Sequence, residues 1–171
     1  GVFLVAPEGF TLAEQSASDN AYMDMAVRVD AHRALAQHRN LQRALSRRIP
    51  TVCFPGDPAT PDAVFPNNVF ATAAGRLVLG HMRHPVRQVE AERSDIRGFF
   101  TQVLGYEEID LRTQPGICEL TGSIVIDRGR GVGYCGLSER CDEIGAAAMA
   151  QAFGLAELVP YALASGEYHG N

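Results

Sequence analysis

Three residues able to carry acid–base chemistry stand at nearly regular intervals along the sequence. They are Asp62, Glu119 and His169, separated by 57 and 50 residues. Two carboxylates facing one imidazole suit a planar cation such as guanidinium, because its N–H donors fork onto carboxylate oxygens. The imidazole can carry a proton near neutral pH. If the fold brings the three residues together, they would bind a guanidino-type group and move protons to and from it.

The elements that must position these residues form a repeat. Each of the three residues follows a predicted strand, over 51–54, 107–111 or 156–163. Two predicted hairpins turn at Gly75 and Gly129, 54 residues apart, and the order strand, loop, hairpin, helix, strand is the same around each. Equivalent loops of a closed or fan-like repeat converge near one axis, whereas three unrelated surface loops would not. The repeat therefore favours one shared pocket.

The other predicted elements complete an α/β pattern. Apolar residues at three- and four-residue steps predict a long helix that begins at Asp19 and ends near Pro50. Its apolar stripe consists of Met23, Val27, Ala31, Ala34, His38, Leu41 and Leu45. A strand over 1–6 precedes this helix, and together they count as a first unit of about three. The remaining hairpin arms and helices are predicted over 64–72 with 76–79, 123–127 with 132–137, 89–104 and 142–153.

Composition excludes several classes of protein. The chain has 171 residues, of which 46% are hydrophobic, so we expect a single domain over 1–171 with one core. The net charge is −5, and no basic cluster alternates with aromatic residues, which argues against nucleic acid or a membrane as partner. The apolar run over 1–6 is too short for a signal sequence or a membrane span. We therefore expect a cytoplasmic protein that acts on a small molecule.

The other chemically able residues are interpreted as structural. The four cysteines show neither C-x-x-C spacing nor the density of a disulfide scaffold, so we expect reduced thiols in the core and no metal site. The glycine-rich segment 129–133 joins two hairpin arms and opens no helix, so no nucleotide or other cofactor is expected. The mixed segment 90–95 is interpreted as a solvated face. The residues concerned are Cys53, Cys118, Cys135, Cys141 and the histidines His32, His38, His81 and His84.

Four short motifs, taken in order, indicate a family. They are PDAVFPNN over 61–68, ELTGS over 119–123, GLSERC over 136–141 and YH over 168–169. In this order and on the matching repeat they resemble the signatures of the guanidino-group-modifying, or pentein, superfamily. Among its members they are most similar to the dimethylarginine dimethylaminohydrolases and the amidinotransferase-like citrulline hydrolases. The resemblance spans essentially the whole chain.

The resemblance implies a fold and an activity. The fold is a pentein-type α/β propeller of five hairpin–helix–strand units around a pocket, with about three units present here. The activity is hydrolysis of a C–N bond in the guanidino group of an arginine derivative, which turns methylated arginine into citrulline and an amine through a covalent Cys intermediate. Citrulline or arginine hydrolysis and amidino transfer are the alternatives. A non-catalytic binding protein of the same fold is the alternative from another class.

The resemblance also assigns roles to single residues. Glu119 matches the acidic partner of the guanidinium and the imidazole, and His169 matches the general acid and base. The substrate-binding residues that it implies are Asp62, Asn68, Arg140 and, from a less well defined loop, Arg87. Asp62 and Asn68 match the first and last polar positions of the hairpin that clamps the substrate, while the two arginines match residues that hold the substrate carboxylate.

Two features depart from the family pattern. Many relatives have Asp where this chain has Asn68. An amide offers a dipole instead of a charge and tolerates a neutral ureido substrate such as citrulline. The alternative is that Asn68 only caps the hairpin. The family nucleophile is a Cys of the fifth unit, and no cysteine here occupies its place. We therefore expect the native polypeptide to continue for roughly 100 residues, and this chain to form homo-oligomers or to associate with the missing segment.

Overall fold

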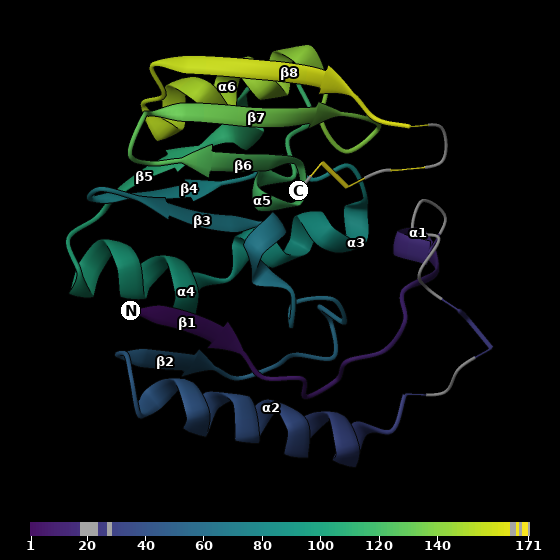
Figure 1. Cartoon of the computed structure of the whole chain (residues 1–171). Helices are drawn as coiled ribbons and strands as arrows, with labels where there is room; N and C mark the ends of the chain where they lie inside the picture. The colour runs from purple at the N-terminus through teal and green to yellow at the C-terminus, as the bar shows by residue number, and fades with distance from the viewer. Residues whose placement is uncertain (18–23, 27–28, 165–166, 168, 171) are drawn as a thin grey trace. The chain divides into compact units, whose positions relative to one another are not determined.

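The computed structural model describes residues 1–17, 24–26, 29–164, 167 and 169–170. The chain comprises two compact units, 1–66 and 67–171. Figure 1 shows the order of helices and strands along the chain. No helix in the part that the structure describes is long and apolar enough to cross a bilayer. The expectation that 1–171 forms a single domain stays a prediction.

The first unit is built on a parallel strand pair. Strand β1 (Val2–Val5) pairs with β2 (Thr51–Phe54), with Val2 opposite Thr51, and helix α2 (Ala31–Ser46) lies between them in sequence. Such a connection is the usual way to join parallel neighbours. A one-turn helix, α1 (Glu14–Ala17), precedes α2. Both predicted strands of this unit are confirmed, and the Phe3 and Phe54 rings meet edge to face at 6.0 Å.

Helix α2 starts later than the apolar stripe predicted. Asp30 caps it by accepting a hydrogen bond from the backbone N–H of Arg33 at 3.0 Å, and residues 24–26 and 29–30 are not helical. A start at Asp19 is therefore wrong, because the cap side chain satisfies the first free N–H groups at Asp30. Asp19, Met23 and Val27 lie outside the described residues. Of the other stripe members, Ala34, His38 and Leu45 are half-buried, and Ala31 and Leu41 are exposed.

The second unit contains two three-stranded sheets of the same design. In each, the first two strands form an antiparallel hairpin and the third runs parallel to the second. The first sheet consists of β3 (Phe70–Ala73), β4 (Arg76–Leu79) and β5 (Glu107–Asp110). The second consists of β6 (Ile124–Asp127), β7 (Val132–Leu137) and β8 (Glu157–Ala162). This arrangement confirms the predicted repeat, and the parallel pair β1–β2 matches the last two strands of each sheet.

The helices of the two repeats differ. Helix α6 (Glu143–Phe153) agrees with prediction: Asp142 caps it, and Gly154 ends it in the left-handed conformation. The helix predicted over 89–104 is instead a series of short turns, because Arg93 leaves the helical conformation. The turns are α3 (Pro85–Gln88), the 3-10 helix η2 (Val89–Glu92), α4 (Ser94–Gly98) and the π-helix η3 (Phe99–Val103).

Three further turns stand between strands and connect them. They are the 3-10 helices η1 (Pro66–Asn68) and η4 (Leu111–Thr113) and the one-turn helix α5 (Leu120–Ser123). Because η1 occupies 66–68, the first hairpin arm begins at Phe70 and not at residue 64 as predicted. Pro66 favours the start of η1, since the proline ring holds φ near the helical value.

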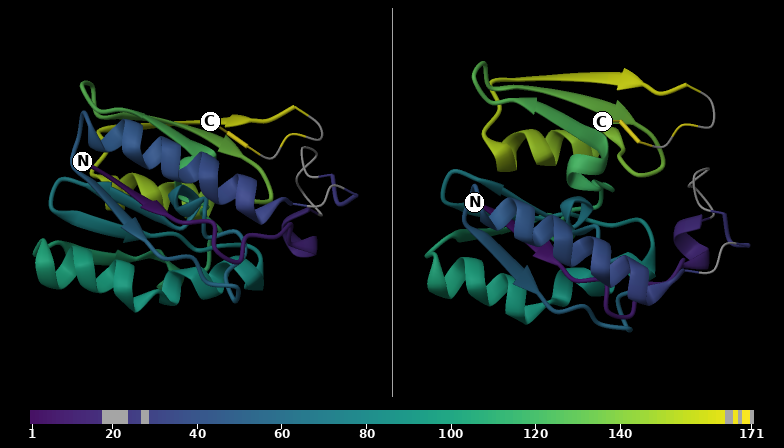
Figure 2. Two further views of the ribbon diagram at one scale, coloured as in Figure 1. Left: turned by 90° about the horizontal axis from the view of Figure 1, so that it is seen from below. Right: turned by 60° about the horizontal axis from the view of Figure 1, so that its bottom comes forward.

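The core of the second unit joins both sheets to α6. It includes Val78 of β4, Ile124 of β6 and Met149 of α6, all at most 2% exposed. Figure 2 shows α6 lying along one face of the β6–β7–β8 sheet. The helix also approaches the segment before α5 closely: a Cβ added at Gly145 would lie 1.9 Å from the Ile117 carbonyl oxygen. A side chain at position 145 would therefore push α6 away from this segment.

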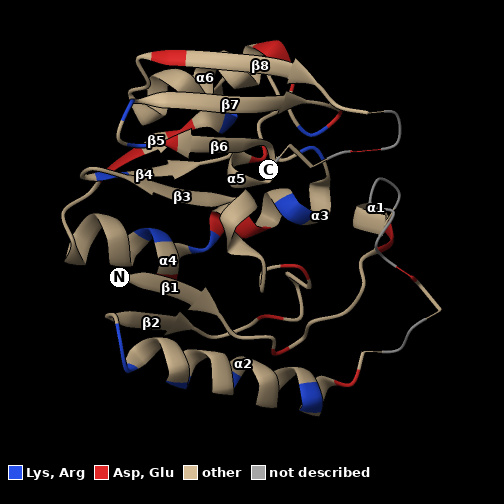
Figure 3. Ribbon diagram, viewed as in Figure 1, with Lys and Arg blue, Asp and Glu red and all other residues tan. Residues whose placement is uncertain are grey.

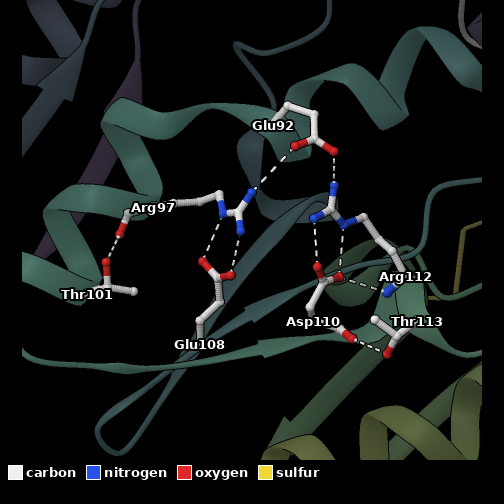
Figure 4. Close-up of polar contacts among 7 residues, drawn as sticks. All are labelled: Glu92, Arg97, Thr101, Glu108, Asp110, Arg112 and Thr113. Carbon is white, nitrogen blue, oxygen red and sulfur yellow. Dashed lines mark hydrogen bonds and ion pairs between the residues drawn. The ribbon is translucent and has the colours of Figure 1, made fainter.

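Charged side chains tie α4 to strand β5 and its following turn. Arg97 donates two hydrogen bonds to Glu108, at 2.9 and 2.7 Å, and Arg112 donates two to Asp110, at 2.8 and 2.6 Å. Glu92 contacts both arginines (Figure 4). Paired N–H donors fit a carboxylate in one orientation, so these contacts set the register of the helix on the strand.

Candidate functional site

The carboxylate of Glu119 is buried at the start of α5. The residue is 1% exposed, and its carboxylate lies 3.4 Å from the Arg140 guanidinium and accepts the backbone N–H of Arg83 at 3.3 Å. Its own backbone N–H donates to the Arg140 carbonyl at 3.0 Å. A carboxylate is tolerated at this depth only with a charge partner and hydrogen bonds. Side chain and backbone thus hold Glu119 in one position.

His169 meets the same arginine. Arg140 Nη1 lies 3.4 Å from His169 Nε2 and 3.4 Å from the Glu119 carboxylate, so one guanidinium contacts both predicted catalytic residues. A guanidinium can only donate, so Nε2 accepts and its lone pair points at the cation. In this arrangement the ring proton is on Nδ1, and Nε2 is the atom able to take up a proton.

Asn68 is fixed beside α5 through its neighbour Asn67. The Asn67 amide donates to Asn68 Oδ1 at 3.0 Å and to Thr121 Oγ1 at 3.1 Å, while the Thr121 hydroxyl donates to the Asn67 carbonyl at 2.8 Å. Asn68 is 7% exposed. The reciprocal pair Asn67–Thr121 therefore joins η1 to α5 and orients the Asn68 amide.

Gly122 allows three segments to meet at α5. A Cβ at this position would lie 2.9 Å from Asn68 Oδ1, closer than side chains normally approach. The Gly122 carbonyl accepts the N–H of Gly170 at 3.1 Å, directly after His169, and the Gly122 N–H donates to the Glu119 carbonyl at 2.9 Å. The turn 119–122 thus contacts the segments that carry Asn68, Arg140 and His169.

The backbone at Leu120 is strained. Its φ is +20°, which among the described residues makes it the one non-glycine residue with positive φ. Such a conformation costs about 1–3 kcal/mol and persists where surrounding contacts enforce it. Leu120 is 0% exposed and packs in the core described above. The strain therefore stands next to Glu119, where it fixes the direction of the chain on either side of the carboxylate.

Asp62 and Arg87 lie in other surroundings. Asp62 belongs to the first unit, is 3% exposed and accepts a hydrogen bond from the Ser16 hydroxyl. Its convergence with Glu119 stays a prediction. Arg87 is buried in the second unit and forms an ion pair with Glu90 at 2.6 Å, three residues along the chain.

Sequence reasoning missed two partners of these residues. Ser16 lies 46 residues from Asp62, and a lone serine gives no periodic signal. Glu90 is 1% exposed, so the interpretation of segment 90–95 as a solvated face is wrong at its first residue. The spacing of Arg87 and Glu90, one helical turn apart, was the available signal.

A family model described as N,N dimethylarginine dimethylhydrolase, eukaryotic, matches residues 6–168. The chain belongs to this family. A sequence search of curated proteins finds no match. The family assignment agrees with the resemblance predicted from the four motifs.

Solved structures confirm the pentein-type α/β fold of this dimethylarginine dimethylhydrolase family member. Apo ArgZ, an arginine dihydrolase of cyanobacteria, superimposes with a TM-score of 0.80 at 20% identity over 98% of this chain and 24% of its own. A Pseudomonas aeruginosa dimethylarginine dimethylaminohydrolase mutant with citrulline gives 0.74 at 20% identity, over 98% of this chain and 62% of its own. The substrate-bound N-terminal domain of ArgZ gives 0.76 at 19% identity, over 96% and 58%. The chain thus spans less than two thirds of each.

The cysteines of this family member form no disulfide. Cys118, Cys135 and Cys141 are 0% exposed, as the core interpretation predicted, while Cys53 is half-buried. Burial raises the pKa of Cys118 to about 11. The Cys135 and Cys141 sulfurs lie 3.5 Å apart, and this hydrogen bond, together with burial, raises the pKa of Cys141. A thiol that stays protonated is a poor nucleophile, so neither Cys118 nor Cys141 suits covalent catalysis.

Proposed function

We propose that the chain is part of a hydrolase that cleaves a C–N bond in the guanidino group of an arginine derivative. One observation carries the proposal beyond the family assignment: Glu119 and His169 together contact a guanidinium group, that of Arg140. The substrate would present the same planar cation with the same N–H donors. A carboxylate and an imidazole that accept one guanidinium have the chemistry to accept another.

The proposed chemistry gives Glu119 an electrostatic role and His169 the proton transfers. Glu119 balances the positive charge of the guanidino carbon and its nitrogens, while His169 Nε2 takes the proton of the attacking thiol and gives it to the amine as the C–N bond breaks. The nucleophile would be a thiolate from outside these 171 residues, since the described cysteines lie in the core or half-buried. His169 would then activate the water that releases the thiouronium intermediate as the ureido product. No cofactor takes part, and we place the reaction in the cytoplasm.

Methylated arginine is the first candidate substrate, with citrulline and amine as products. Arginine or citrulline is the second candidate substrate, and Asn68 favours this candidate. The buried Asn68 amide lies next to Gly122, in the turn that carries Glu119. An amide can both donate to and accept from a neutral ureido group, whereas a carboxylate only accepts. Asp62, Arg87 and Arg140 are proposed to bind the rest of the substrate, as the motifs implied. Amidino transfer and a purely binding role are the remaining alternatives.

The test measures turnover by the complete polypeptide. Methylated arginines, arginine and citrulline are each supplied, and the ureido or amine product is quantified by mass spectrometry. Turnover that Glu119→Gln and His169→Ala both abolish, while each variant remains folded by circular dichroism at the assay temperature, supports the proposal. Binding of these compounds without any turnover would favour the non-catalytic alternative, and neither binding nor turnover would refute the guanidino assignment.

A further inference from the structure

Helix α2 and the residues that follow it carry a concentrated positive charge. Residues 31–48 contain five arginines and no acidic residue, although the whole chain is acidic with a net charge of −5. The rest of the chain therefore holds ten basic against 20 acidic residues. Figure 3 shows the blue positions distributed along α2. The five arginines are Arg33, Arg39, Arg43, Arg47 and Arg48.

Four of these arginines share one side of the helix. Ala34, Leu35, His38, Gln42 and Leu45 are half-buried and mark the inward side. At about 100° per residue the arginines at positions 33, 39, 43 and 47 fall on the opposite half, whereas Arg48 lies beyond the end of α2; all five are exposed. Three of them, at positions 39, 43 and 47, follow one another at four-residue steps, about 6 Å apart along the axis. With Gln42 and Ser46 they line a shallow groove.

The described residues supply no counter-charge for this side. Within the residues that the structure describes, none of the five arginines forms an ion pair, whereas eight of the nine arginines of the second unit do. In the described part of the chain, Arg43 donates a side-chain hydrogen bond to the Asn40 amide oxygen, at 3.4 Å. Like charges at four-residue spacing destabilise an isolated helix. A solvated helix face would more simply mix both signs, so the arrangement fits a surface that meets an anion.

We propose that the outer side of α2 binds a short acidic segment of another protein. Guanidinium groups fork onto carboxylates, and carboxylates four residues apart on a partner helix would match the 6 Å spacing of positions 39, 43 and 47. The site is independent of the proposed hydrolase activity.

Two other anionic partners fit less well. Residues 31–48 contain no Phe, Tyr or Trp side chain on which a base could stack, and the rest of the chain is acidic, which disfavours a long polyanion. A lipid surface requires a free apolar face, but Ala34, Leu35 and Leu45 lie on the half-buried inward side. A short segment that carries carboxylates would contact α2 and no other part of the chain.

Fluorescence anisotropy with a labelled helical peptide, carrying glutamate at every fourth position, tests the proposal on the 171-residue chain. Replacing Arg39, Arg43 and Arg47 together by Gln is expected to weaken binding by about tenfold or more, from three exposed charge pairs. The matched control replaces Arg76, Arg128 and Arg130 by Gln, which changes the net charge equally outside α2, and should keep affinity within about twofold. Binding should also weaken as salt rises.

Several outcomes would overturn the proposal. Equal losses in both triple variants would mean that only net charge acts. Tighter binding to RNA or to phosphatidylglycerol vesicles than to the peptide would assign the face to another anion. Self-association that disappears in the α2 variant, measured by sedimentation, would assign it to a second copy of the chain. The six substituted positions of the two triple variants lie on or near the surface, so both variants should stay folded. Thermal unfolding of each variant checks this.

Discussion

Arginine has opposite surroundings in two regions of this protein. Around α4 and β5, Arg97 and Arg112 each hold a carboxylate by two N–H donors, and Glu92 contacts both (Figure 4). The five arginines of residues 31–48 are exposed and form no ion pair within the described part of the chain; Figure 3 shows blue positions along α2. The same side chain therefore acts as a structural tie where neighbouring elements present acids to it, and remains available to a partner where they do not.

Two further arginines of the second unit are almost fully buried. Arg140 and Arg87 are paired and only 4% and 6% exposed, so their partners cannot be lost without leaving a charge in the core.

The largest effect is expected at the site itself. In the complete enzyme His169→Ala should lower kcat by about 10²–10⁴-fold, because the proton donor and acceptor is removed. Substrate binding should change little. His38→Ala is the control, since this histidine lies on α2 and should chiefly affect stability. Parental turnover of the His169 variant between pH 6 and 9 would remove His169 from the mechanism.

Breaking the buried pair of Arg87 should be the most damaging change to the fold. Glu90→Gln leaves the guanidinium without its counter-charge and should lower the free energy of unfolding by about 3–5 kcal/mol. Arg130→Gln breaks an ion pair whose arginine side chain is 79% exposed, and should stay within about 0.5 kcal/mol. Urea denaturation of the two variants measures the difference, and similar midpoints would contradict it.

Adding a charge at Asn68 should change substrate preference. Asn68→Asp is expected to favour guanidinium over ureido substrates by about 1–3 kcal/mol, the strength of one hydrogen bond to a charged group. The ratio of kcat/KM values for arginine and citrulline reports the shift. An unchanged ratio would place the amide outside the pocket and leave it with a capping role.

Removing the Thr121 hydroxyl should have a smaller effect, near the site. Thr121→Val keeps the shape but loses the contacts with Asn67, at a cost of about 1 kcal/mol in stability. Because these contacts orient Asn68, the variant should also shift KM more than Thr101→Val, whose hydroxyl donates to the Arg97 carbonyl four residues earlier. Equal KM values in the two variants would show that the Asn67–Thr121 pair does not position the site.

The smallest effect is expected on α2. Arg43→Gln removes the repulsion between the charge at position 43 and the arginines at positions 39 and 47. The variant should therefore be more stable by a few tenths of a kcal/mol. Thermal unfolding at low and high salt checks this, since the gain should shrink as salt screens the charges. A loss of stability would show that the arginine has an internal partner.

Part of the candidate site could be predicted and part could not. The positions of Glu119, Arg140 and His169 followed from motifs placed on a repeat, and the structure brings these three together. Their mutual contact through Arg140 had no sequence signal, because it joins segments 21 and 29 residues apart. Ser16 and Glu90 escaped prediction for the same reason. The partner of a single polar residue becomes evident only when the segments that carry the two residues have folded and packed.

The sequence by itself determined the repeat, the strand order and the start of α6. Alternating apolar residues, turn glycines and the cap at Asp142 act over a few residues, so local chemistry suffices for them. Only the tertiary structure decided where α2 starts, how the 85–103 segment breaks into short turns, and which arginines are paired. Those outcomes depend on burial and on carboxylates supplied by other elements, and such long-range contacts arise only when the chain is packed.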